Sequence, residues 1–447
     1  MQAGDDMRAS ASESSVLMVI AGSVAGAALL LGGGQGGLGD VATQLAAVVL
    51  LAWLCLDRSG HRLPPWAWWP IVAALALPVL QVLPLPASVW SHLGGRAGLA
   101  QELAVAGVPP PSRLGLDPVA SERAGAWLLP GIALYLATLR MRARQQHRLL
   151  ALVIALAVAS VVVGLAQVTG GAASEWRFHA RTNASGMVGF FANRNHAATF
   201  LAACLPIATV FAVRAWRDDP RNPLRVAVTI GVFVLLLAGL WMTQSRAGFA
   251  IGFAMLCLSP LLFDAGTADR ASGRRRAILA FAALLVAGAA TLAAIGQSAT
   301  GALDGGRSVQ HATTIDAAEH YLPAGSGLGT FRLAYAPFER VSASGADHVI
   351  VNHAHNDYLE LWLEAGWLAL PVMLALLGFF AWSASRAFRD RAREGPWRRA
   401  AAVSLLAPAL HSALDYPLRT TAHIALCGVL LALVAGTAVQ AAREEAG

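Results

Sequence analysis

The sequence predicts an all-α integral membrane protein with about twelve membrane-spanning helices. Of its 447 residues, 56% are hydrophobic and only 13% are charged, whereas a soluble globular protein has about 25% charged residues. The apolar segments are continuous rather than alternating, so they favour helices over a β-barrel. The chain has no polar low-complexity tract and no basic domain. These features exclude the disordered and nucleic-acid-binding classes, and we expect no nucleic acid among the partners.

Twelve apolar segments are the candidate spans. A helix needs about 20 mostly apolar residues to cross the hydrocarbon layer of a bilayer. The segments that reach or approach this length are 16–34, 40–56, 66–85, 124–139, 149–168, 196–215, 225–243, 247–263, 278–296, 367–385, 400–416 and 423–440. Some have only about 17 residues, so one or two of them could be re-entrant. The first segment follows three acidic residues, and we interpret it as a retained span rather than a cleaved signal peptide.

The distribution of arginines predicts the orientation. All 33 basic residues are arginines, and with the N-terminus inside, the cytoplasmic segments hold 22 of them and the opposite side 11. Loops rich in arginine stay on the cytoplasmic side. Three sizeable loops, 86–123, 169–195 and 297–366, then face outward. We expect the chain to divide into nine helices within 1–296, a large outward loop at 297–366, and three helices with a cytoplasmic tail at 367–447.

The third outward loop contains the most polar residues. Arg307 and His311 have helical spacing among small and apolar residues, which predicts a short amphipathic helix on the membrane surface. After Pro323 the chain continues with the glycine-rich run from Gly325 to Gly329. No strand precedes this run, so we interpret it as a tight turn rather than a phosphate-binding loop.

Two histidines precede the helix that leads into the span at 367–385. His353 and His355 are followed by Asn356, and the helix then carries a polar row of Asn356, Glu360 and Glu364. The positive end of a helix disfavours a protonated imidazole beside it. A neutral imidazole can accept a proton, so either histidine is a candidate general base.

Two other interpretations of these histidines remain open. They could cap the helix and bond backbone groups. They could also bind zinc together with His348, although no cysteine or aspartate stands at ligand spacing to complete such a site. We therefore expect no metal.

Three further polar clusters lie at the outward ends of spans. Their members are Arg194 with Asn195, Arg246, and Asp415 with Arg419. An arginine at membrane depth is costly unless it faces a cavity or a partner, or extends its head to the interface. A guanidinium group binds oxyanions with two parallel hydrogen bonds. Together with Arg307, these clusters predict a site for a lipid-anchored diphosphate.

These runs resemble the O-antigen ligase and polymerase superfamily. The resemblance covers most of the chain and is strongest from about residue 186 to residue 420, with the segment around His355 its most specific part. The runs that carry it are 191–196, 243–248 and 353–366, with weaker similarity at 81–86 and 116–118.

The resemblance implies a membrane glycosyltransferase of about twelve spans, with a glycosyltransferase C-type architecture and a large periplasmic loop between late spans. It implies transfer of a glycan from undecaprenyl pyrophosphate to an acceptor glycan or to lipid A–core, with inversion and without a metal, nucleotide or other cofactor. The enzyme would lie among the lipids of the bacterial inner membrane, and its active site would face the periplasm.

The resemblance also implies roles for individual residues. His355 matches the histidine that acts on the acceptor hydroxyl, with His353 as the second choice. Arg246 and Arg307 match the arginines that hold the diphosphate. The remaining candidates, one further arginine for the diphosphate and five supporting residues, are Arg194, Asn195, Asn356, Glu360, Asp415 and Arg419.

The sequence leaves three activities open within the superfamily: ligation, repeat-unit polymerisation and protein O-glycosylation. A fourth hypothesis, from a different class, is a transporter or flippase of lipid-linked sugar. It would use the same arginines and no base, but we find no internal repeat of the kind on which many transporters are built.

Overall fold

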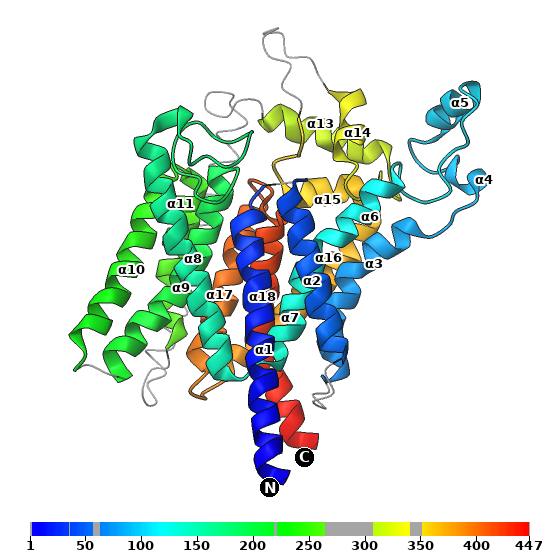
Figure 1. The fold of residues 1–447 in the computed structure, drawn as a ribbon. Coiled ribbons are helices and arrows are strands. Elements are labelled where there is room, and N and C mark those ends of the chain that lie inside the picture. The colour runs from blue at the N-terminus through cyan, green and yellow to red at the C-terminus, as the bar shows by residue number, and fades with distance from the viewer. Residues whose placement is uncertain are drawn as a thin grey trace, which may run out of the picture.

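The computed structural model describes residues 2–34, 36–56, 63–218, 221–263, 307–339 and 351–446. These residues form helices, connecting turns and an isolated β-bridge between Pro84 and Arg113. The helices of the bundle (Figure 1) are α1 (Gln2–Leu31), α2 (Leu38–Leu56), α3 (Trp69–Val82), α6 (Pro118–Trp127), α7 (Leu129–Arg140), α8 (Ala143–Thr169), α9 (Arg194–Asp218), α10 (Pro223–Met242), α11 (Arg246–Leu258), α16 (Ala369–Arg389), α17 (Gly395–His411) and α18 (Thr421–Ala446).

Several of these helices are long and apolar enough to cross a membrane, as the sequence predicts. Within the described ranges, six segments meet that length and composition, and three shorter apolar helices accompany them. The six are Leu38–Leu56, Pro65–Val82, Ala143–Thr169, Arg194–Asp218, Pro223–Met242 and Asp357–Arg389, and the shorter ones are Ser15–Leu31, Arg246–Leu262 and Thr421–Gly436. The predicted segment at 278–296 lies outside the described residues, and a total of twelve spans stays a prediction.

Two predicted segments differ from the helices that form. The segment at 124–139 is divided between α6 and α7, because Pro130 has no N–H to continue the helical hydrogen bonds. The segment at 400–416 ends earlier, since α17 stops at His411. Tyr416 precedes Pro417, and a residue before proline disfavours the helical conformation. Residues 412–416 are therefore a turn at the end of the bundle, not part of a span.

Small residues allow close packing around two central helices. α9 packs against α10, α11 and α17, while α18 packs against α1, α7, α16 and α17. A Cβ atom on Gly428 of α18 would lie 2.2 Å from the carbonyl oxygen of Gly131 in α7, so the two backbones touch. Such contacts between small residues are typical of helices that associate within a membrane.

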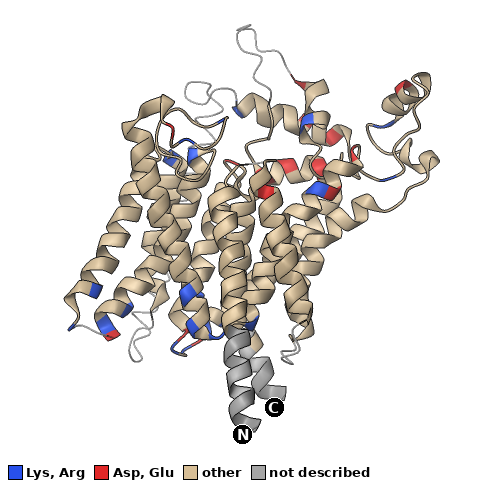
Figure 2. Cartoon of the chain, viewed as in Figure 1, with Lys and Arg blue, Asp and Glu red and all other residues tan. Residues whose placement is uncertain are grey.

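A layer of shorter helices lies at one end of the bundle, with its first two members extending to one side (Figure 1). It comprises α4 (Ala87–Trp90), α5 (Ala97–Val105), α13 (Arg307–His320), α14 (Phe331–Tyr335) and α15 (Asp357–Ala365). α13 confirms the helix predicted from the spacing of Arg307 and His311. Figure 2 shows acidic residues at this end, around α13 and α15, and several arginines at the other end, near α9, α10 and α17.

The glycine-rich run is a tight turn that joins this layer to the bundle. All six backbone N–H groups from 325 to 330 donate hydrogen bonds within the protein. Their acceptors include the side chains of Gln81 in α3 and Glu364 in α15. Gly325, Gly327 and Gly329 all have positive φ, which favours glycine. Because its N–H groups are occupied, this loop does not cradle a phosphate.

We predict that Gly325→Ala destabilises the protein. Gly325 has a φ of +76°, and an added Cβ would lie 2.5 Å from the carbonyl oxygen of Glu364. The strain and the clash should cost about 2–4 kcal/mol of unfolding free energy, seen as a lower melting temperature in detergent. Gly378→Ala in α16 is the matched control, because a Cβ there meets nothing within 4 Å. Equal melting temperatures for both variants would contradict this account of the turn.

Candidate active site

A buried carboxylate lies at the centre of the candidate site. Asp415 is in the turn after α17, and its side chain has no exposed surface. Nδ2 of Asn195 and Nδ2 of Asn193, which lies 3.3 Å away, donate to its Oδ2. The backbone N–H of Tyr416 donates to its Oδ1 at 2.9 Å. The turn and the start of α9 are thus held together through one side chain.

Cationic and imidazole groups also face Asp415. Nδ1 of His355 lies 3.2 Å from Oδ1, and a guanidinium nitrogen of Arg307 lies 3.9 Å from Oδ2. Nε2 of His196 is 3.9 Å from Oδ1. Burial alone would raise the pKa of Asp415, but the hydrogen bond from His355 and the positive charge of Arg307 hold that pKa well below its ordinary value. Asp415 is therefore an ionised acceptor.

His355 is partly exposed and is oriented by its contact with Asp415. An ionised carboxylate can only accept hydrogen bonds, so Nδ1 of His355 carries the proton that it shares with Asp415. No described residue bonds Nε2, and 25% of the side chain is exposed. The backbone of His355 has a φ of +50°. Non-glycine residues in this conformation store strain, which is often found at functional sites. The arrangement leaves a basic nitrogen facing outward from a buried carboxylate.

His353 has different surroundings. Its Nδ1 lies 2.7 Å from Oε1 of Glu360, whose Oε2 accepts from the N–H of Ala354. The imidazole ring stacks on Tyr416 with ring centres 4.3 Å apart, and His353 is buried. The two histidines therefore differ: the ring of His353 is packed in the interior, and the ring of His355 is partly exposed. Neither caps the following helix, because Asn356 does so by accepting from the N–H groups of Tyr358 and Leu359.

Arg419 forms ion pairs with carboxylates of α15. It pairs with Glu364 at 2.7 Å, Glu360 at 3.5 Å and Asp357 at 3.7 Å. These three acidic residues share one face of the helix, and all are buried. Arg419 thus fixes α15 to the bundle. Its predicted role in supporting the site stays a prediction, and the observed contact is structural.

The three predicted diphosphate arginines begin three different helices. Arg307 is the first residue of α13 and donates to the carbonyl of Leu414 at 3.2 Å. Arg194 begins α9, where its guanidinium lies 3.4 Å from Oγ of Ser185. Arg246 begins α11 and is exposed, with no hydrogen bond or ion pair to a described residue.

A chain of hydrogen bonds connects the start of α11 to Asp415. Oγ of Ser245 caps α11 by accepting from the N–H of Gly248 at 3.0 Å. The same hydroxyl donates to Oδ1 of Asn195 at 2.8 Å, and Nδ2 of Asn195 donates to Asp415. The residue next to Arg246 therefore belongs to the network that orients His355.

Several residues of this network were not among the predicted site residues. Ser245 was recognisable as a helix cap, because it immediately precedes the apolar run of α11. Asp357 and Glu364 were recognisable as one acidic helix face with Glu360. Tyr416, which stacks on His353 and contacts His355 edge-on, carries no comparable signal in the sequence.

The zinc alternative has no support in the described part of the chain. Within those ranges, no three His, Cys, Asp or Glu side chains are grouped to hold a metal ion. His353 and His355 each direct Nδ1 to a different carboxylate. His348, the third proposed ligand, lies outside the described residues.

The fold and the site define a multi-pass membrane protein with a polar site at one end of its helical bundle. Residues 231–374 match the family model described as O-antigen ligase. This match supports the assignment to an O-antigen ligase-like superfamily that the motifs predict. The matched region contains Arg246, Arg307, His353 and His355, whereas Asp415 lies beyond it. No curated protein matches the chain.

The family supports a membrane enzyme of the O-antigen ligase or polymerase type, which is a glycosyltransferase-like activity. In general terms, it implies a lipid-linked glycan and an acceptor as substrates.

We predict that Arg419→Gln strongly destabilises the protein. The substitution leaves three buried carboxylates without their cation, and breaking a buried ion pair costs about 3–5 kcal/mol. Thermal unfolding in detergent measures the loss. Arg332→Gln is the control, since Arg332 is exposed in α14 and should change stability by less than about 0.5 kcal/mol. If Arg419→Gln unfolds like the control, the ion-pair network does not hold α15.

Proposed function

We propose that this protein transfers a glycan from undecaprenyl pyrophosphate to a hydroxyl of an acceptor sugar on the periplasmic side of the bacterial inner membrane. The observation that carries the proposal is the pair of His355 and Asp415. In this pair, a buried, ionised carboxylate holds a partly exposed imidazole through one of its nitrogen atoms. The superfamily assignment supports the class of substrates.

In the proposed reaction, Nε2 of His355 removes the proton of the acceptor hydroxyl. Asp415 keeps the proton of the ring on Nδ1 and stabilises the imidazolium that forms, as the carboxylate does in hydrolase triads. The acceptor oxygen then bonds to the anomeric carbon as the bond from that carbon to the diphosphate oxygen breaks. Attack from the face opposite the leaving diphosphate inverts the anomeric configuration.

Arg307, Arg246 and Arg194 are the proposed ligands of the diphosphate. Negative charge increases on the diphosphate as it leaves, and preorganised cations that face such a charge lower the barrier. The contact between Arg307 and Asp415, the carboxylate bonded to His355, supports this role for one of these cations. Arg246, which has no described partner, keeps its guanidinium available for an external anion.

The surroundings of Arg246 fit a donor with a lipid tail. Trp241 and Phe249 are 70% and 46% exposed, and their rings contact each other at 5.5 Å between centres. Phe253, one turn further along α11, is 52% exposed. In a membrane these apolar side chains would face lipid. A polyprenyl chain lying against them would bring its diphosphate to the start of α11.

Ligation and polymerisation use the same proposed geometry and differ in the acceptor. A strain that lacks the protein distinguishes them. Loss of all long chains on lipid A–core, with accumulation of lipid-linked polymer, indicates a ligase, whereas a loss of chain length alone indicates a polymerase. A transporter or flippase would instead form no product from purified protein, donor and acceptor in detergent.

We predict that His355→Gln abolishes glycan transfer in that purified assay. Loss of a general base lowers rates by about 10²–10⁴-fold, and the variant should keep the melting temperature of the native protein within a few degrees. His92→Gln is the control, because His92 is an exposed histidine that bonds the carbonyl of Ser88, away from the described site. Retained transfer by His355→Gln would remove His355 as the base.

We predict that Arg246→Ala lowers transfer without lowering stability. Arg246 makes no hydrogen bond or ion pair with a described residue, so its removal leaves no buried group unpaired. Loss of one charged contact to the diphosphate should cost about 10–100-fold in kcat/KM. Steady-state rates at several donor concentrations measure it. Arg332→Ala, a substitution at another exposed arginine, should leave kcat/KM unchanged. Equal kinetics in both variants would exclude Arg246 from the donor site.

A further inference from the structure

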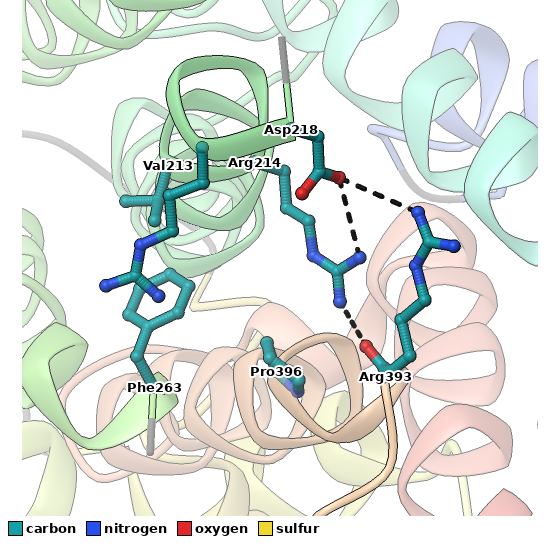
Figure 3. Close-up of a pocket in the computed structure, with 7 residues that line it drawn as sticks. Val213, Arg214, Asp218, Phe263, Arg393 and Pro396 are labelled. Carbon is teal, nitrogen blue, oxygen red and sulfur yellow. Dashed lines mark hydrogen bonds and ion pairs between the residues drawn. The ribbon is translucent and has the colours of Figure 1, made fainter. Parts of the chain in front are cut away.

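An arginine-lined pocket lies at the end of α9 that is opposite the candidate active site. It has a volume of about 310 Å³ and opens between the end of α9, the segment after α11 and the start of α17 (Figure 3). Its lining residues are Val213, Arg214, Arg217, Asp218, Phe263, Arg393 and Pro396.

The pocket carries more positive than negative charge. Asp218 is the sole acidic residue among its lining residues, and it pairs with Arg214 at 3.7 Å and with Arg393 at 3.8 Å. A guanidinium nitrogen of Arg214 also donates to the carbonyl of Arg393. Arg217 stacks on the ring of Phe263, 5.3 Å from its centre, and makes no hydrogen bond or ion pair with a described residue. Among the lining residues, three guanidinium groups outnumber one carboxylate, and the neighbouring Glu394 pairs with His147 at 2.7 Å.

The position of the pocket separates it from the candidate active site. α9 has 25 residues, so it is about 37 Å long at 1.5 Å per residue. Its first residue, Arg194, belongs to the candidate site, and its last residue, Asp218, lines the pocket. That length exceeds the hydrocarbon thickness of a bilayer, about 30 Å, and places the two sites at opposite membrane faces. Trp216, 63% exposed beside the pocket, is typical of the membrane–water interface.

We propose that this pocket binds the phosphate of an anionic phospholipid headgroup, at the membrane face opposite the candidate active site. Basic pockets between membrane helices bind such headgroups, and a guanidinium group matches the geometry of a phosphate. Val213, Phe263 and Pro396 form an apolar wall beside the arginines. The glycerol and upper acyl carbons of a lipid would cover that wall, whereas a free phosphate ion would leave it exposed. This proposed lipid site is separate from the site proposed for glycan transfer.

Lipid binding to the purified full-length protein tests this proposal. Native mass spectrometry with phosphatidylglycerol and phosphatidylcholine measures the apparent Kd of each lipid, and we expect tighter binding of phosphatidylglycerol. Each arginine near a lipid headgroup contributes about fivefold in affinity, so the double substitution Arg217→Gln with Arg393→Gln should weaken phosphatidylglycerol binding about 25-fold.

Two further variants distinguish a loss of lipid binding from a loss of folding. Asp218→Asn should strengthen phosphatidylglycerol binding several-fold, because it removes the carboxylate that competes for Arg214 and Arg393. Arg225→Gln is the control. Arg225 is exposed at the start of α10, which follows α9 in the chain, and it does not line the pocket. Equal Kd values for the two lipids, or an unchanged Kd in the double variant, would overturn the proposal. Displacement of the lipid by millimolar inorganic phosphate would also overturn it and indicate a site for the free ion.

Discussion

The buried negative charge of Asp415 is the constraint on which the site depends. A carboxylate without exposed surface is tolerated only when hydrogen bonds and positive charge surround it. Here the partners come from distant parts of the chain: the start of α9, the segment before α15 and the start of α13. The need to satisfy one side chain therefore brings these segments together. The same contacts orient His355, so stability and the proposed chemistry rest on one interaction.

The helix directions reinforce this arrangement. α9 and α11 begin in the site with an arginine as first residue, and Arg307 is the first described residue of α13. The N-terminus of a helix carries partial positive charge and unpaired backbone N–H groups. Guanidinium groups in the first turn add to this positive field, at a cost in helix stability that a bound anion would offset. Under the proposed function, a multiply charged diphosphate bound here would account for arginine at positions where an acidic residue would favour the helix.

The sequence predicts helices, which depend on neighbouring residues, and misses side-chain contacts between residues that are distant in the chain. Continuous apolar runs identify the spans, and the run around Arg307 identifies α13, because both signals are local. The pairing of Arg419 with three carboxylates joins segments about 55 residues apart, and Asp415 meets Asn195 across 220 residues. No periodic pattern encodes such contacts. The predicted end of α17 was wrong. Apolar residues continue beyond His411, but the residues before Pro417 form a turn rather than a helix.

The different surroundings of His353 and His355 follow from the backbone rather than from the side chains. In an extended segment, residues two apart point to the same side, so both rings would be expected to share one environment. The positive φ of His355 breaks that alternation. One ring then packs against Glu360 and Tyr416, and the other reaches Asp415. This conformation costs about 1–2 kcal/mol for a non-glycine residue. It persists because Asn356 anchors the next position, capping α15 and bonding the carbonyl of Ala413.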